Sequence, residues 1–227
     1  MIISRDLLFG FSTNHFEKKD GHYLNKDVFD SYEQLKKKAN ADGFDLKIAS
    51  SFRNFERQLI IWNEKFSGKR SCLDEHEVPV DVSSLSSTKK IFLILNWSAI
   101  PGLSRHHWGT DLDVYDNNSN QGNALNLTLQ NYQKGYQKSF SKWLRENIEQ
   151  FGFYYPYYQD LTDGVQMEPW HISHIKTAHN YELSLSLNEV RNFLESDNIH
   201  ILGKGEILKN IKFIYENYIE RYFYKNK

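Results

Sequence analysis

The sequence predicts one packed domain of mixed helices and strands, on three observations. The chain has 227 residues, enough for one full core or for one domain with an appendage. Hydrophobic residues make up 40% of it and aromatic residues 15%, which is typical of a globule rather than of a disordered chain. Segments with helical spacing of apolar residues occur together with short segments typical of strands.

The first half of the chain contains three predicted helices. In order, we expect a helix at 27–42, a strand at 45–50, a helix at 54–66, a polar loop at 67–87 and a helix at 88–97. Gly43 suits the C-terminal end of the first helix, and Asn54 suits the N-cap of the second.

The second half begins with a strand and ends with helices. In order, we expect a strand at 111–114, a long excursion at 117–137, a helix at 139–153, a strand at 164–172 and a long helix at 204–224. Ser186 and Glu189 form a capping box, which predicts a helix start.

Charge and hydropathy exclude some classes of protein. Lys plus Arg is 28 and Asp plus Glu is 29, so the balance does not indicate a basic nucleic-acid-binding protein. No stretch reaches the roughly 18 apolar residues of a membrane span. The N-terminal residues lack the pattern of a signal peptide. We therefore expect a cytoplasmic location for the chain as given, with the periplasm or envelope as the alternative if a signal was removed.

Cysteine chemistry is limited to one residue, Cys72. A single cysteine excludes an intramolecular disulfide and a zinc site built on cysteines. We expect a buried, inert thiol rather than a catalytic nucleophile, which would need a paired base.

The stretch "SRHHWGTDLDVYD", residues 104–116, concentrates histidines and aspartates. His106 and Asp113 are natural zinc ligands, because zinc takes imidazole and carboxylate groups in a tetrahedral shell. The residues alone leave the third ligand open among the other histidines.

A second segment, "EPWHISH", covers residues 168–174. Pro169 argues against a helix interior, so this is not the helical arrangement in which two histidine ligands lie four residues apart. An extended segment with a local bend could direct both Glu168 and His171 to one site.

Three segments in order resemble the VanY-like D-alanyl-D-alanine carboxypeptidases, zinc peptidases that share the hedgehog/DD-peptidase fold. "SRHHWGTDLD" is similar to their S-x-H-x-x-G-x-x-x-D signature and "EPWH" to their E-x-W-H signature. "SSFRNFERQ", residues 50–58, is similar to their S-x-x-R segment with a glutamine five residues after the arginine. The resemblance covers roughly residues 7–175.

The resemblance implies a Zn²⁺ site and a catalytic base. His106, Asp113 and His171 match the zinc ligands, and Glu168 matches the base. Zinc lowers the pKa of water to about 7, and a glutamate beside it can accept a proton from the water and pass it to the leaving amine.

Four further residues match positions that bind the substrate. Arg53, Gln58 and Ser104 match groups that contact the terminal carboxylate and nearby peptide, and Trp170 matches a tryptophan that lines the site. Arg53 is also implied in catalysis, as the cation that stabilises the developing oxyanion. A planar guanidinium suits a free carboxylate, although a surface salt bridge is the plainer interpretation of an isolated arginine.

Asp111 departs from the pattern, which often has alanine two residues before the aspartate ligand. On a strand it shares a face with Asp113. We expect it to orient a ligand through a hydrogen bond or to face solvent, rather than to bind metal. We expect a structural role for His107. His174 and His179 could lie at the rim of the site, but we expect an ordinary structural role for each. Gly109 suits tight backbone geometry.

The implied activity is the zinc-dependent removal of a C-terminal D-amino acid, D-alanine first, from peptidoglycan stem peptides or muropeptides. The alternatives are an endopeptidase of the same superfamily and a catalytically silent zinc-binding module. The implied fold is α+β, with a small, mainly antiparallel sheet flanked by helices. We expect a peptidase domain over residues 1–180 and a helical extension over 181–227 packed on it. The oligomeric state stays open.

Overall fold

The computed structural model describes residues 3–19, 21–120, 122, 124–158, 163–196 and 198–224. Its largest sheet has four strands in the order β3-β6-β8-β7, and every neighbouring pair is antiparallel. These strands are β3 (Leu46–Ser50), β6 (Asp111–Asp116), β7 (Phe153–Tyr154) and β8 (His171–His174). Helices flank the sheet, so the fold is α+β as predicted.

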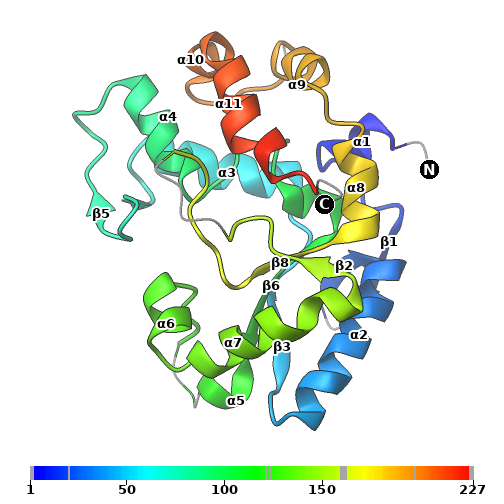
Figure 1. The fold of residues 1–227 in the computed structure, drawn as a ribbon. Coiled ribbons are helices and arrows are strands. Elements are labelled where there is room, and N and C mark those ends of the chain that lie inside the picture. Colours follow the sequence, from blue (N-terminus) through cyan, green and yellow to red (C-terminus); the bar gives the residue numbers. More distant parts are fainter. Residues whose placement is uncertain are drawn as a thin grey trace.

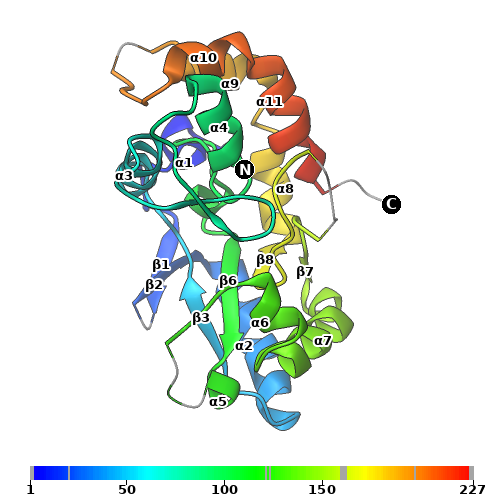
Figure 2. The same ribbon diagram turned by 90° about the vertical axis from the view of Figure 1, so that its left-hand side faces the viewer.

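The helices form two groups, one above the sheet and one beside its lower part (Figures 1 and 2). The lower group is α2 (Lys26–Ala41), α5 (Asn117–Asn120), α6 (Leu129–Gln133) and α7 (Lys138–Asn147). The upper group is α1 (Arg5–Leu8), α3 (Phe55–Phe66), α4 (Ser87–Leu95), α8 (Ile175–Glu182), α9 (Leu187–Leu194), α10 (Lys204–Lys209) and α11 (Ile211–Tyr218). No helix in the described part of the chain is long and apolar enough to cross a membrane.

The remaining elements are short. Two small hairpins pair β1 (Phe16–Lys19) with β2 (His22–Asn25) and β4 (Cys72–Leu73) with β5 (Pro79–Val80). Among the described residues, the 3₁₀ turns are η1 (Arg105–Trp108), η2 (Ile148–Phe151) and η3 (Glu220–Tyr222).

Two apolar clusters support this arrangement. One joins the sheet residues Leu112, Val114 and Ile172 to buried side chains of α2 and α7. The other joins α1, α3 and α4 to α8–α11. The C-terminal helices therefore share a core with N-terminal elements, while the division of the chain at residue 180 stays a prediction.

Local sequence signals locate several elements correctly. The predicted segments 27–42, 45–50, 54–66 and 88–97 correspond to α2, β3, α3 and α4. Asn54 caps α3 by accepting a hydrogen bond from the amide of Arg57, and Ser186 caps α9 in the same way through the amide of Glu189. These caps satisfy amides that the first helical turn leaves unpaired.

The predicted strand at 164–172 is wrong over most of its length, because β8 begins only at His171. The preceding amides donate to distant partners instead of to a strand. Val165 donates to the hydroxyl of Tyr222, Gln166 to the carbonyl of Asn96 and Glu168 to that of Tyr157. Pro169 has no amide hydrogen to contribute to a ladder.

The predicted long helix at 204–224 is also wrong, because α10, α11 and η3 are separate. Asn210 leaves helical geometry at φ −103° and ψ 10°, and its side chain donates to the carbonyl of Glu206. Such a side-chain bond competes with the backbone ladder. Ile219, with φ −129° and ψ −74°, makes the second break.

Three other predictions need smaller corrections. The helix at 139–153 ends at Asn147 and continues as η2, and Gly152 then takes a left-handed φ of 78° before β7. The loop at 67–87 contains the β4–β5 hairpin. The excursion at 117–137 contains α5 and α6, while residues 121 and 123 lie outside the described residues.

Candidate metal site

The register of the sheet brings two of the predicted ligands together. Asp113 in β6 is paired with His171 in β8, and Asp111 is paired with Ser173. Because side chains alternate along a strand, Leu112 and Val114 face the core with α2 and α7, and Asp111 and Asp113 face the other way. A polar face of the sheet therefore carries both aspartates beside His171.

His106 reaches the same place from η1. This turn ends at Gly109, whose φ of 63° is left-handed, and a Cβ there would lie 3.0 Å from the ring of Phe16. Glycine is thus required for the chain to pass from η1 into β6. His106 donates from Nδ1 to the carbonyl of Ser51 at 2.9 Å, which leaves Nε2 3.4 Å from Oδ2 of Asp113.

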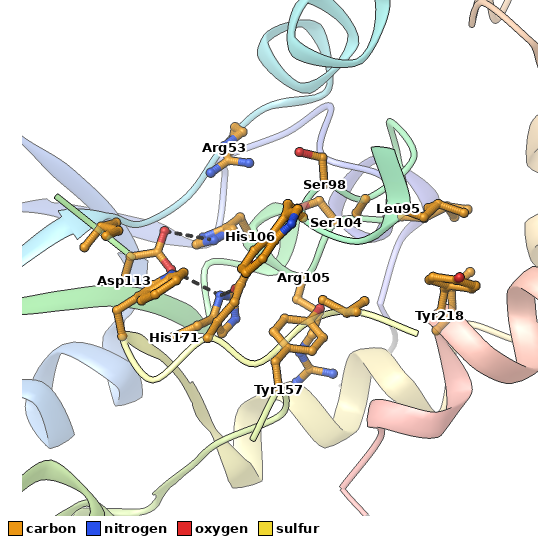
Figure 3. Close-up of a pocket in the computed structure, with 18 of the residues that line it drawn as sticks. Arg53, Leu95, Ser98, Ser104, Arg105, His106, Asp113, Tyr157, His171 and Tyr218 are labelled. Carbon is orange, nitrogen blue, oxygen red and sulfur yellow. Dashed lines mark ion pairs between the residues drawn. The ribbon is translucent and has the colours of Figure 1, made fainter. Parts of the chain in front are cut away.

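His106, Asp113 and His171 fit a metal ion. Their possible ligand atoms all lie within 4.8 Å of one another, and all three residues are buried (Figure 3). Oδ1 of Asp113 lies 3.2 Å from Nδ1 of His171 but takes part in no hydrogen bond among the described residues. A buried carboxylate oxygen without such a bond is costly, and a cation would satisfy it.

Asp111 orients His171 and is fully buried, so the solvent-facing alternative is wrong. Nε2 of His171 donates to Oδ1 of Asp111 at 2.9 Å, which leaves Nδ1 facing Asp113. Arg105 donates from Nε to the same Oδ1 at 2.8 Å. Thr110 and Ser173 donate their hydroxyls to Oδ2 at 2.5 and 3.1 Å. The hydrogen bond at Nε2 therefore leaves Nδ1 as the nitrogen of His171 that can bind a metal ion.

Negative charge is concentrated around His171. Burial by itself would lower its pKa, but the neighbouring carboxylates of Asp111, Asp113 and Glu168 raise that pKa well above the usual value. Burial would likewise raise the pKa of Asp113, whereas His106 and His171 hold it well below the usual range. The site is thus built to hold positive charge between its carboxylates.

A cavity of about 270 Å³ adjoins these residues. Arg53, Ser104, Glu168 and Trp170 line it, as expected of groups that touch a substrate or the reacting water. Oε2 of Glu168 lies 3.3 Å from Nδ1 of His171, at the edge of the candidate metal position. Figure 3 shows Arg53 on the opposite side of His106 from His171.

Gln58 does not belong to this lining. Its side chain is fully buried, accepts a hydrogen bond from Nη1 of Arg53 at 2.8 Å and donates to the carbonyl of Ala99 at 2.7 Å. The structure therefore gives Gln58 the role of holding Arg53 in place, and its expected contact with substrate is not seen in this geometry.

The other polar residues singled out by sequence are structural. Burial lowers the pKa of His107 to about 3, so the neutral ring accepts at Nε2 from the amide of Gly102 and donates from Nδ1 to the carbonyl of Arg53. His174 bonds to Ser31 and Thr177. Burial raises the pKa of the Cys72 thiol, which keeps it protonated and inert.

His179 lies outside the metal cluster. Its Nδ1 lies 3.5 Å from Oε2 of Glu182, and its side chain is 40% exposed. It is therefore neither a ligand nor part of the cavity lining.

Sequence reasoning missed two parts of the site. Arg105 lies between Ser104 and His106, so its place within the motif was a signal, although its partners are distant. The cavity is also lined by Tyr157 and, from the C-terminal segment, by Tyr218, Ile219 and Phe223. The only sequence signal for this contribution was the apolar stripe of the predicted C-terminal helix, which indicated packing against the rest of the domain or a partner.

Comparison with known families agrees with this geometry. The family model of VanY, described as D-alanyl-D-alanine carboxypeptidase, matches residues 21–177. The chain belongs to the VanY family. The matched range contains every predicted site residue, from Arg53 to His171, whereas α9–α11 lie beyond it.

Sequence identity to individual D-alanyl-D-alanine carboxypeptidases is low. A D-alanyl-D-alanine carboxypeptidase of Enterococcus faecalis is 29% identical over 153 residues, which make up 66% of this chain and 45% of that protein. The chain thus spans less than half the length of that relative.

Two solved VanY structures share the fold. VanYB in complex with D-alanine-D-alanine has a TM-score of 0.53 at 23% identity, covering 78% of this chain and 87% of its own. A mutant of the D,D-pentapeptidase VanY in complex with Zn(II) has a TM-score of 0.52 at 24% identity, covering 77% and 87%.

Proposed function

We propose that this chain is a zinc-dependent carboxypeptidase that removes a C-terminal D-amino acid, D-alanine first, from peptidoglycan stem peptides. The observation that carries the proposal is the cluster of His106, Asp113 and His171, with Glu168 beside it in a cavity that Arg53 also lines. Membership of the VanY family and the zinc and D-alanine-D-alanine complexes of two relatives support the same metal and substrate.

His106 Nε2, the Asp113 carboxylate and His171 Nδ1 would hold the ion, because the hydrogen bonds at the other ring nitrogens leave these atoms free to bind it. When bound, zinc supplies Lewis acidity for the peptide carbonyl and for water.

The chain's own residues perform the remaining steps. The Glu168 carboxylate accepts a proton from the attacking water and donates it to the leaving amine. The guanidinium of Arg53, fixed by Gln58, pairs with the terminal carboxylate of the peptide. Trp170 and Tyr157 wall the cavity and exclude water around these charges.

The test is a panel of stem peptides incubated with zinc-loaded protein. It includes a pentapeptide ending in D-Ala-D-Ala, a tetrapeptide ending in an L,D bond, a cross-linked dimer, and each linear peptide as its C-terminal amide. We expect release of D-alanine from a peptide with a free carboxylate and no release of D-alaninamide from its amide, because Arg53 has no charge partner there. Release of no C-terminal residue from any of them would overturn the proposal, and cleavage of the dimer alone would indicate an endopeptidase.

Glu168→Gln separates catalysis from metal binding. We expect this variant to lose about 10²- to 10⁴-fold in kcat, the usual contribution of a general base. Its zinc content, measured by atomic emission, should equal that of the parent protein. Equal activity of variant and parent would instead favour a zinc-binding module in which this glutamate has no catalytic role.

A further inference from the structure

We propose that the C-terminal segment beyond the VanY match holds the metal ligand His171 in place through a buried chain of polar contacts. This inference rests on the proposed metal site. The chain of contacts runs from the amide of Tyr224 through Glu182 and Arg105 to Asp111, which contacts His171. The carbonyl of Tyr222 joins it through the hydroxyl of Tyr154.

Glu182, the last residue of α8, is the junction between the C-terminal segment and the site. Its Oε2 accepts from the amide of Tyr224 at 3.0 Å, and its Oε1 accepts from Nη1 of Arg105 at 2.9 Å. The hydroxyl of Tyr154 lies 3.0 Å from the same Oε1 and 3.2 Å from the carbonyl of Tyr222, so it can donate to either. The Glu182 side chain is only 1% exposed, so these bonds replace its hydration.

Arg105 connects Glu182 to the candidate metal site by hydrogen bonds to both sides. Its Nε contacts Asp111, its Nη1 contacts Glu182, and its Nη2 donates to the hydroxyls of Tyr154 and Ser173, both at 2.8 Å. The guanidinium is planar and rigid, so fixing one edge fixes the direction of the others. The guanidinium carbon lies 4.8 Å from the ring centre of Trp108, which closes one face.

Charge makes the chain interdependent. Arg105 and Asp111 are both buried, with side-chain exposures of 5% and 0%. Arg105 lies between two buried carboxylates, those of Asp111 and Glu182, at 2.8 and 2.9 Å. Removing one member leaves a buried charge without its partner, which is far costlier than losing a surface pair.

The position of these residues argues for a role beyond packing. Glu182, Tyr222 and Tyr224 all lie beyond residues 21–177, the range that the VanY model matches. Asp111, beside the candidate metal position, is therefore joined through Arg105 and Glu182 to residues beyond the matched range. Arg105 and Glu182 are positioning residues, since neither touches the candidate metal position.

Two variants test this in the full-length protein. Tyr154→Phe removes one hydroxyl from the chain and keeps the ring, and Glu182→Gln removes one charge. Their matched controls are Tyr215→Phe, which loses a buried tyrosine bond to the carbonyl of Leu185, and Glu206→Gln, which alters an exposed pair with Lys209. Zinc affinity is measured by competition with a chromogenic chelator, and thermal unfolding of the metal-free proteins is measured beside it.

We expect zinc affinity to fall about tenfold in both test variants, the scale seen for partners of metal ligands, and to stay unchanged in both controls. A merely structural role would lower the unfolding temperature of Tyr154→Phe and Tyr215→Phe alike and leave zinc affinity intact, and that result overturns the inference. If the parent binds zinc and the test variants bind it with the same affinity, the inference fails but the proposed function survives. A parent that binds no zinc overturns both.

Discussion

At the scale of single residues, the hydrogen bond that His171 makes with Asp111 determines which ring nitrogen can bind a metal ion. Asp111 accepts from Nε2, so Nδ1 is the atom that faces Asp113 and Glu168. Sequence reasoning identified Asp111 as the departure from the family pattern, but could not choose between an orienting and a solvated side chain. The choice depends on Arg105 and Ser173, whose contact with Asp111 follows from the sheet register and from the burial of η1.

Asp111→Asn tests this orienting role. The amide keeps the shape of the side chain but loses the charge that pairs with Arg105, so we expect zinc affinity to fall about 10- to 100-fold. Metal competition titration measures this, with Asp81→Asn as the control, because Asp81 is an exposed aspartate bonded to Ser83. An unchanged affinity would reduce Asp111 to a packing role.

At the scale of elements, the sequence predicted what local signals determine. The helices α2, α3 and α4 have clear periodicity and side-chain N-caps, so their limits follow from neighbouring residues. The strand at 164–172 and the helix at 204–224 failed because their backbone groups bond to distant residues or to an asparagine side chain. The three ligands came from motif resemblance, and the β6–β8 pairing explains why two of them meet.

Gly102 tests the turn that leads into η1. Its φ of 87° suits glycine, its amide donates to Nε2 of His107, and a Cβ there would overlap the ring of Phe193. We expect Gly102→Ala to lower the free energy of unfolding by about 1–3 kcal/mol, because the backbone is left-handed and the site is crowded.

The matched control is Gly205→Ala within α10, where nothing lies within 4 Å of an added Cβ. Alanine there should raise the free energy of unfolding by about 0.5–1 kcal/mol, since it favours the helix. Urea denaturation measures both variants. Equal stability of Gly102→Ala and the parent would show that the turn adapts without strain.

At the scale of the whole molecule, the candidate site lies where two cores meet. The cavity takes Trp170 from the cluster around the sheet, and Leu95, Leu185 and Ile219 from the cluster of the upper helices. In Figure 3 the cavity extends from the candidate ligands towards Leu95 and Tyr218. The segment outside the family match therefore forms part of the cavity wall.

Tyr218→Ala tests this wall. Loss of an aromatic contact worth about 1 kcal/mol corresponds to a rise in KM of roughly fivefold for a cleaved stem peptide. The control is Phe213→Ala in the same helix, whose side chain is 45% exposed and does not line the cavity. Steady-state kinetics measures both, and equal KM values for the two variants would remove the C-terminal segment from substrate binding.

The central claim is that His106, Asp113 and His171 hold a zinc ion, and anomalous diffraction at the zinc edge tests it most directly. Crystals of zinc-loaded protein should show a peak about 2.0–2.2 Å from His106 Nε2, an Asp113 oxygen and His171 Nδ1. Nε2 of His171 should still donate to Asp111. A peak bonded to Asp111 or to Nε2 of His171, or no peak between these three side chains, would contradict the account.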